Sequence, residues 1–428
     1  MPIPTVKIEI GFDTTSVGGP FFTFGSSSVK EDNPQSIFDN VDYRFGGQVL
    51  YDVTSRAKNF TINRGRSRIL DKTQTGSANI TFTNQDRAFD PFYESSPYYP
   101  DIRPRRDVVL TTIVGSSTAV QFTGLVEDWS LDYRVTGESI ASAACVDGFA
   151  LFGGQQLNLH TATSQTSGNR ISAILNRSEV DWPADLRDID TGSQTLQADV
   201  IEQGRETLDY LQLVETSEQG FLFMSKTNEV TFKDANTAAA IGTVVFSDAG
   251  TAIPYQDITV DYGTELLYNR VTVARSGGTV QTAVDSASQS DYGIVSLDLN
   301  GLLSNSDASA NAIANFLIGK YSQPELRFAT MTVQLAGLGT ADQTTVLGIE
   351  LGDIVRVEYQ PNQIGSRIVK DVQVIGLRHA ASPDSYEVTF SFQSTETAAF
   401  VFGGGSAADS YPFSLFAGGT VTGSPFGL

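Results

Sequence analysis

The segment from Leu70 to Leu110 constrains the fold more than any other part of the chain. It begins with apolar and polar residues that alternate around Ile80 and Phe82, the pattern of a half-buried β-strand. A dense loop rich in proline and tyrosine follows, and a second apolar run begins at Val108. Because prolines pre-set backbone angles and aromatic rings offer large apolar faces, we expect this loop to be ordered and packed on the rest of the protein.

The same loop carries basic and acidic side chains close together in the sequence. This pattern favours charge-assisted pairs that fix the loop over a site for anions, and the dipeptide Asp90-Pro91 is typical of the start of a turn. The candidate pairs join Arg87, Arg103, Arg105 and Arg106 to Asp86, Asp90 and Asp101. We predict a structural or interface role for Arg87, Phe89, Asp90, Pro91, Tyr98, Tyr99, Pro100 and Arg103.

The length of 428 residues predicts two or three domains, because single cores stop growing at about 250–300 residues. The net charge is −21, which argues against direct binding of nucleic acid, since phosphate contacts need a basic surface. An acidic wall can instead repel DNA and let it slide through a channel. The alternative is that the excess of acidic residues serves solubility.

The single cysteine, Cys145, excludes an internal disulfide framework, and its small neighbours indicate a buried residue. The N-terminal sequence MPIPTVKIEIGF predicts a strand and not a signal peptide. No segment approaches the roughly 18 continuous apolar residues of a membrane span. We therefore expect synthesis in a cytoplasm and a role as a soluble or assembled component.

The distribution of patterns along the chain predicts a mainly β protein with α+β parts. Residues 1–150 indicate a β domain with a long loop at 13–45. Residues 151–250 indicate a small α/β module, with one helical stripe formed by Ile201, Gly204, Leu208 and Leu211 and a hairpin at 221–232.

The β pattern resumes in residues 251–398, which we predict to be a second β domain related to the first. One helix is expected at about 308–321, with Asp307 as its N-cap. The last segment, 399–428, is rich in glycine and phenylalanine and cannot form its own core. We expect it to be an arm that buries its rings against a neighbouring subunit, through Phe402, Phe413, Phe416 and Phe426.

Catalytic and cofactor patterns are weak in this sequence. His160 and His379 have no metal-ligand spacing, and no GxSxG motif occurs. Paired carboxylates could hydrolyse glycosides, but a solvated surface explains them better. The glycine pairs lack the spacing of a phosphate-binding loop, and Gly277-Gly278 favours a hairpin turn. We predict no enzyme activity and no cofactor; the carboxylates considered are Glu127, Asp128, Asp181, Asp185, Asp188 and Asp190.

Several segments resemble the minor tail proteins of long-tailed bacteriophages, that is, the tail-tip or baseplate-hub proteins. A weaker similarity in the order of the elements continues to about Phe392, whereas 13–45 and 399–428 look particular to this chain. The resemblance is carried by INRGRSRILD (62–71), GSANITFTNQDRAFDP (76–91), SSPYYPDIRPRRDV (95–108), FTGLVEDWSLDY (122–133) and DWPADLRDIDTGSQTL (181–196).

This resemblance implies a structural virion protein at the distal end of the tail. Each subunit of a homotrimer would contribute two tube-like domains, of β-barrel or sandwich form, to a ring with pseudo-sixfold symmetry that closes or adapts the tail tube and takes part in host attachment and DNA delivery. The implied partners are further copies of the chain, the distal tail protein or the tail tube protein, the tape-measure protein, and tail fibre or receptor-binding proteins.

Two other functions remain open at this point. A distal tail protein forms a hexameric ring at the tube end and differs in the number of subunits around the axis. A tail-associated enzyme that degrades cell walls would release fragments from peptidoglycan. A secreted adhesin fits less well, since the sequence shows no signal peptide.

Overall fold

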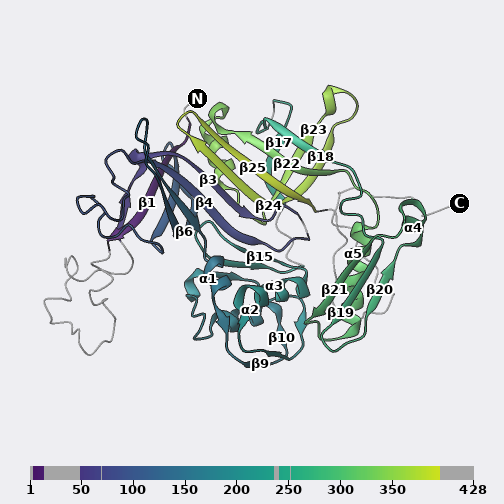
Figure 1. Ribbon diagram of the computed structural model, residues 1–428. Coiled ribbons are helices and arrows are strands. Elements are labelled where there is room, and N and C mark those ends of the chain that lie inside the picture. Colours follow the sequence, from purple (N-terminus) through teal and green to yellow (C-terminus); the bar gives the residue numbers. More distant parts are fainter. Residues whose placement is uncertain (1–2, 14–48, 69, 236–240, 251, 396–428) are drawn as a thin grey trace.

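The computed structural model describes residues 3–13, 49–68, 70–235, 241–250 and 252–395 (Figure 1). A sheet of thirteen mostly antiparallel strands forms the upper part of the molecule in this view, and two smaller units lie below it. The prediction of a mainly β fold with α+β parts is confirmed. The predicted long loop at 13–45 and the four phenylalanines of the arm, Phe402, Phe413, Phe416 and Phe426, fall outside the described residues, apart from Asp13.

The N-terminal half of the sheet follows the order β3-β4-β7-β6-β5-β1-β2. Its strands alternate as the sequence predicts: in β4, Ala78, Ile80 and Phe82 are buried and face the core. The strands are β1 (Thr5–Asp13), β2 (Val49–Asp52), β3 (Ala57–Gly65), β4 (Gln74–Thr83), β5 (Asp107–Val114), β6 (Ser117–Asp132) and β7 (Ile140–Val146).

The C-terminal half continues the same sheet through β24, which pairs antiparallel with β3. Apolar side chains of both halves belong to one continuous core. The hydrogen-bonded strand order runs from β2 to β18, and β23 and β17 branch from β24, so the described strands form an open sheet and not the closed barrels that tube-like domains imply. The strands are β17 (Ile241–Ser247), β18 (Asp257–Asp261), β22 (Arg327–Gln334), β23 (Ile354–Tyr359), β24 (Ile368–Ser382) and β25 (Ser385–Ser394).

Two glycines allow the two halves to approach each other closely where β3 ends. Gly65 has a φ of +87°, and a Cβ at this position would lie 2.2 Å from the carbonyl oxygen of Ile375. A Cβ at Gly376 would lie 2.6 Å from the carbonyl oxygen of Arg66. Side chains are therefore excluded at both positions, and the Arg66 amide donates to the Ile375 carbonyl at 2.8 Å.

The central unit, residues 149–233, packs helices and short strands around its own core beneath the sheet. The sequence predicted that the helix of Ile201, Gly204, Leu208 and Leu211 begins at Ile201, and this start is wrong. Ile201 lies in a strand and Gly204 has a φ of +86°, so the helix begins at Thr207. The predicted hairpin at 221–232 is confirmed by the antiparallel pair β15–β16. The helices are α1 (Phe149–Gly154), α2 (Ser167–Leu175) and α3 (Thr207–Glu218).

Short strands complete the central unit, and most of them pair in twos. The strand β11 runs parallel to β16, which lies between β11 and β15. The strands are β8 (Gln156–Leu157), β9 (His160–Ala162), β10 (Gln165–Thr166), β11 (Arg187–Ile189), β12 (Thr195–Leu196), β13 (Asp199–Ile201), β14 (Arg205–Glu206), β15 (Phe221–Met224) and β16 (Val230–Lys233).

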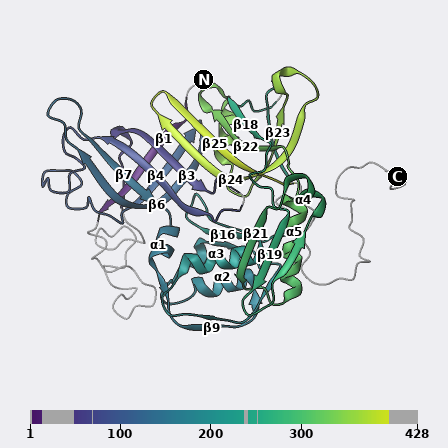
Figure 2. The same ribbon diagram turned by 45° about the vertical axis from the view of Figure 1, so that its right-hand side comes forward.

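A further unit, which we call the lobe, comprises residues 262–326 and lies beside the central unit (Figure 2). Its three-stranded sheet has the order β20-β19-β21 and packs on one helix. The predicted hairpin turn at Gly277 is confirmed by the β19–β20 pair, in which Gly277 has a φ of +70°. The elements are β19 (Arg270–Arg275), β20 (Gln281–Val284), α4 (Ser286–Tyr292), β21 (Ser296–Leu302) and α5 (Asp307–Tyr321).

The helix α5 forms at the expected position, but its N-cap differs from the prediction. The hydroxyl of Ser306 accepts from the Ser309 amide at 3.1 Å, so Ser306 caps the helix. Asp307 instead pairs with Arg275 at 2.6 Å. The remaining helix, α6 (Thr340–Gly348), precedes β23, and single 3-10 turns lie at Thr54–Arg56, Ala184–Leu186, Leu335–Gly337 and Pro361–Gln363.

Candidate functional site

The proline- and tyrosine-rich loop between β4 and β5 packs on the N-terminal half of the sheet. Its central residue, Phe89, is fully buried, and its ring lies 4.5 Å from that of Phe82 and 5.5 Å from that of Trp129. Tyr98 stacks on both Phe89 and Phe12, with ring centroids 5.4 and 4.4 Å away. These rings make the inner side of the loop part of the core.

A succession of tight turns forms the first part of the loop. Amide-to-carbonyl hydrogen bonds link residues three apart, from Arg87 to Asn84, from Asp90 to Arg87 and from Tyr93 to Asp90. The carboxylate of Asp90 also accepts from the Phe92 amide at 2.9 Å, which is the turn expected for Asp90-Pro91. The backbone of the loop is therefore fixed by local hydrogen bonds before any contact with another protein.

Asp90 connects the loop to the strand end opposite. Its carboxylate pairs with Arg87 at 2.6 Å and accepts from the hydroxyl of Tyr133 at 2.7 Å. Burial opposes the ionisation of Asp90, but the hydrogen bonds from Tyr133, the Phe92 amide and Arg87 outweigh it and hold its pKa below the ordinary value. Asp90 is thus an ionised and fully engaged group at neutral pH.

Other charged residues of the loop pair partly as the sequence suggested. Arg106 and Asp101 form a buried pair at 3.2 Å within the segment. Asp86, however, pairs with Arg56 from the turn before β3, at 2.8 Å, and not with an arginine of the loop. The Nε of Arg103 donates to the carbonyl of Pro100 at 2.8 Å. The pairs therefore fasten the loop to itself and to the turn before β3.

The outer side of the loop faces solvent and presents apolar groups. Phe92 is 86% exposed and Tyr99 is 43% exposed, and Pro100 and Arg103 are exposed beside them. Isolated exposed hydrophobic residues are common, but an exposed phenylalanine on an ordered, proline-fixed loop is suited to contact with another protein. Of the predicted residues, Phe89 and Asp90 are buried, Pro91 and Tyr98 are half-buried, and Arg87, Tyr99, Pro100 and Arg103 are exposed.

Sequence reasoning missed three residues that hold the loop. Each of them, Arg56, Trp129 and Tyr133, lies at least 33 positions from Phe89 and Asp90 in the chain, so no local pattern points to them. The Trp129 indole donates to the Arg103 carbonyl at 3.3 Å, and the Arg56 guanidinium lies 5.9 Å from the Tyr98 ring centre. Their positions follow from strand pairing alone.

The residues considered for catalysis do not form a common site. Asp188 pairs with Lys233 at 2.9 Å, and Asp190 lies 3.7 Å from the same amine. His379 is buried and hydrogen-bonded to the Tyr386 hydroxyl at 3.1 Å, and burial lowers its pKa to about 3. Glu127, Asp128, Asp181 and Asp185 are exposed.

Among the described residues there is no group of three metal-binding side chains, and no helix is long and apolar enough to cross a membrane. Cys145 is buried as expected, and burial raises the pKa of its thiol.

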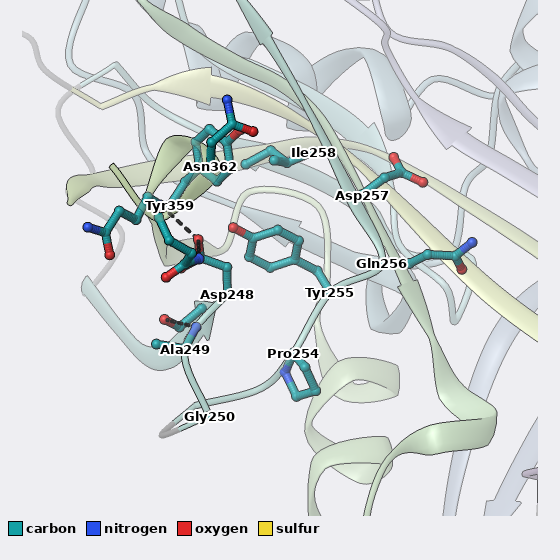
Figure 3. Close-up of a pocket in the computed structure, with 13 residues that line it drawn as sticks. Asp248, Ala249, Gly250, Pro254, Tyr255, Gln256, Asp257, Ile258, Tyr359 and Asn362 are labelled. Carbon is teal, nitrogen blue, oxygen red and sulfur yellow. Dashed lines mark hydrogen bonds between the residues drawn. The ribbon is translucent and has the colours of Figure 1, made fainter. Parts of the chain in front are cut away.

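A polar hollow of about 530 Å³ lies between the β17–β18 connection and the turn after β23 (Figure 3). The side chains of Asp248, Tyr255 and Tyr359 line it. Asp248 is already engaged, because its carboxylate accepts from the Gln360 amide at 2.8 Å and pairs with Arg367 at 2.5 Å. The hollow is thus a surface depression in which the carboxylate of Asp248 is already engaged within the protein.

Comparison with known proteins identifies the fold. No protein-family model and no curated protein sequence matches the chain. A solved tail protein of 43 kDa from the prophage MuSo2 of Shewanella oneidensis has a similar structure, with a TM-score of 0.51 and 14% identity over 81% of this chain and 96% of that one. A tail protein from Neisseria meningitidis MC58 has a TM-score of 0.55 and 12% identity over 83% and 95% of the two chains.

At these identities the likeness establishes the fold. The chain has the architecture of these two tail proteins along almost their entire length. The resemblance to tail proteins that the sequence segments indicated is therefore confirmed at the level of the fold.

Proposed function

We propose that the protein is a structural component of a bacteriophage tail tip, a hub that forms a homotrimeric ring at the end of the tail tube. The observation that carries this proposal is the fold shared with two tail proteins over more than four fifths of this chain. Function is assigned to sites and not to folds, so the proposal also has to identify the surfaces that assemble.

The two halves of the large sheet are the proposed ring-forming parts. They are joined edge to edge by β3 and β24, so each chain presents two β units in a fixed relation. In three copies this gives six β units around one axis, which matches a sixfold tube. Within this proposal the divisions 1–150, 151–250, 251–398 and 399–428 are two ring-forming domains, a peripheral module and an arm.

The outer side of the loop between β4 and β5 is the proposed contact with a neighbouring tail component. Phe92 and Tyr99 supply the exposed apolar surface, and the buried rings beneath them hold that surface in one conformation. A pre-ordered contact surface loses little conformational entropy when it binds. The net charge of −21 is consistent with a channel wall that repels DNA.

The partners proposed for this ring are further copies of the chain, the distal tail protein or the tail tube protein, the tape-measure protein, and tail fibre or receptor-binding proteins. Its proposed place is the distal end of the tail, where the ring closes the tube until host attachment and then admits DNA. Residues 399–428, with Phe402, Phe413, Phe416 and Phe426, are proposed to bind the neighbouring copy.

Electron microscopy of tails from the phage that encodes this chain tests the proposal by counting copies around the axis. Three copies at the tube end agree with a hub, whereas six copies would replace it with a distal tail ring. Native mass spectrometry of the purified chain gives a second measurement, with an expected mass of three times 46.0 kDa.

An incubation of the purified protein with peptidoglycan tests the alternative that the protein is an enzyme that degrades cell walls. The proposal expects no released fragments from the wild type. Release that disappears in Asp188→Asn, but persists in a variant of an unrelated exposed carboxylate such as Asp298→Asn, would assign the protein to the cell-wall-degrading enzymes instead.

A further inference from the structure

The lobe is attached to the large sheet at one place. It is inserted between β18 and β22, and these strands are neighbours in which Asp261 pairs with Arg327. Both connections to the lobe therefore leave the sheet side by side, at the ends of two paired strands. Such a pair of adjacent strand ends is a geometry in which a few backbone angles can absorb a rotation.

The lobe has a core of its own. Val271 and Val273 of β19 pack against Ile313 and Leu317 of α5, and all four are fully or almost fully buried. This core is distinct from the cores of the large sheet and of the central unit. The lobe can therefore keep its internal structure while its position changes.

Apolar contacts join the lobe to the central unit in both directions: Leu213 of α3 and Ala235 pack against the core of the lobe, and Leu303 of the lobe enters the central unit. Leu303, in the connection between β21 and α5, is buried in the core of the central unit and not in that of the lobe. Its backbone is held from the same side: its amide donates to the Ser217 hydroxyl at 2.9 Å, and its carbonyl accepts from the Gln197 amide at 2.8 Å. Figure 2 shows the lobe, with β19, β21 and α5, beside α2 and α3 of the central unit.

Polar side chains also join the two units around Leu303. Gln194 donates to the hydroxyl of Ser304 at 2.7 Å, and both side chains are buried. The amide oxygen of Gln194 has no hydrogen-bond partner within the described residues, although it is buried. Gln197 accepts from Arg275 at 3.0 Å and donates to the carbonyl of Ser276 at 3.1 Å. Because water can replace these bonds and can satisfy the free oxygen, separating this part of the interface is compensated by hydration.

The other contacts of the lobe with the large sheet are few. Arg68 and Glu265 pair at 3.0 Å with both side chains more than half exposed, so this pair contributes little to holding the lobe. Lys370 pairs with Glu325 at 2.7 Å close to the strand ends that carry the lobe. Leu70 packs against the core of the lobe.

We propose that the lobe is a hinged body that rotates about the ends of β18 and β22, and that Leu303 is the anchor that holds it closed on the central unit. This motion is a property of the single chain and does not depend on the proposed place of the protein in a tail. Opening would expose the surface around Leu196 and Gln194 of the central unit, which Ser304 covers in the closed position.

Distance measurements between two spin labels test the hinge. Val280→Cys places one label on the lobe and Leu159→Cys places the other on the central unit; these positions are 61% and 64% exposed. The native Cys145 is buried and is the sole cysteine of the sequence, so labelling at the two new positions is selective. Pulsed electron resonance on frozen samples then reports the distribution of distances.

The wild type is expected to show a main short distance and a minor longer one. Leu303→Ala is expected to enlarge the longer component several-fold, because it removes the anchor. Gln197→Ala is expected to enlarge it less, and it leaves the cores intact in case Leu303→Ala does not fold. Leu317→Ala is the matched control: it shortens a leucine equally buried within the lobe itself and is expected to lower the stability of the lobe without enlarging the longer component.

Either of two results would overturn the proposal. One is a single narrow distance that neither Leu303→Ala nor Gln197→Ala changes, since the lobe would then be rigidly fixed. The other is an equal increase of the longer component in Leu317→Ala, because local unfolding of the lobe would then explain the data better than a hinge.

Discussion

Two phenylalanines of one loop are expected to respond to the same substitution in opposite ways. Phe89 and Phe92 lie three positions apart, but Phe89 is fully buried among Phe12, Phe82 and Trp129, whereas Phe92 is 86% exposed. Phe89→Ala removes a ring from a packed cluster and leaves a cavity. Substitutions of this kind cost about 3–5 kcal/mol of unfolding free energy.

Phe92→Ala is the matched variant, because it removes the same group from the same loop without opening a cavity. Its effect on the free energy of unfolding is expected to stay within about 0.5 kcal/mol, as for other surface substitutions. Its effect on assembly is expected to be large, because the exposed ring is proposed to contact a neighbouring tail component. The inner residue therefore serves stability and the outer residue serves association.

Chemical denaturation of the purified variants, followed by tryptophan fluorescence, measures the first quantity. Trp129 lies 5.5 Å from Phe89 and should report the unfolding of this cluster. Native mass spectrometry or mass photometry measures the second, with wild-type protein as reference. Equal destabilisation by both substitutions would refute the division of the loop into an inner and an outer side, and undiminished assembly of Phe92→Ala would refute the proposed contact.

Three further substitutions test other parts of the structure. Gly65→Ala should lower the free energy of unfolding by more than about 1 kcal/mol, since φ is +87° and the new Cβ would lie 2.2 Å from the Ile375 carbonyl oxygen; thermal denaturation measures it, and an unchanged melting temperature would contradict the close approach. Asp90→Asn should lower the free energy of unfolding by about 1–3 kcal/mol at pH 7, because it weakens charged hydrogen bonds. The pKa of Asp90 is lowered in the folded protein, so the difference from the wild type should shrink as the pH falls through this lowered pKa. A difference that does not depend on pH would contradict an ionised Asp90. Burial raises the pKa of Glu215 to about 7, so the folded protein binds the proton of this carboxyl group more tightly than the unfolded chain does. The free energy of unfolding should therefore fall between about pH 4.5 and about pH 7. Glu215→Gln should flatten this part of the pH profile of stability, and an unaltered slope would contradict the raised pKa of Glu215.

The strands of the large sheet were predictable from the sequence because their side chains alternate between the core and the surface. In β4 the buried residues Ala78, Ile80 and Phe82 occur at every second position, which is the period of a strand with one buried face. The hairpin of β15 and β16 was predictable for a similar reason, since two apolar runs flank a polar turn. A local pattern is sufficient wherever burial follows a single period.

The start of α3 and the cap of α5 were not predictable in this way. The spacing of Ile201, Gly204, Leu208 and Leu211 fits a helix, but the chain before Thr207 pairs as β13 and β14 and turns at Gly204. Asp307 was expected to cap α5, but Arg275 from the neighbouring strand β19 attracts its carboxylate. In both places a partner distant in the sequence outweighs the local preference.

At the candidate site, too, the sequence predicted the local features and did not predict the contacts with distant residues. The sequence predicted an ordered loop with internal ion pairs, because its prolines, aromatic residues and charges are neighbours in the chain. It did not predict Tyr133 or Trp129 as partners of the loop, because β-strand pairing brings them there. It also did not distinguish Phe89 from Phe92, whose environments differ only when the loop folds over the sheet.

The sequence by itself determined the mainly β character, the ordered loop and the resemblance to tail proteins, since each depends on residues that are close together in the chain. Only the tertiary structure decided that β3 and β24 join two halves into one open sheet and that residues 262–326 form a lobe with its own core. The physical reason is that burial and strand pairing between distant segments depend on the packing of the whole protein. A local sequence pattern shows only which face of one element is apolar, and not which element packs against it.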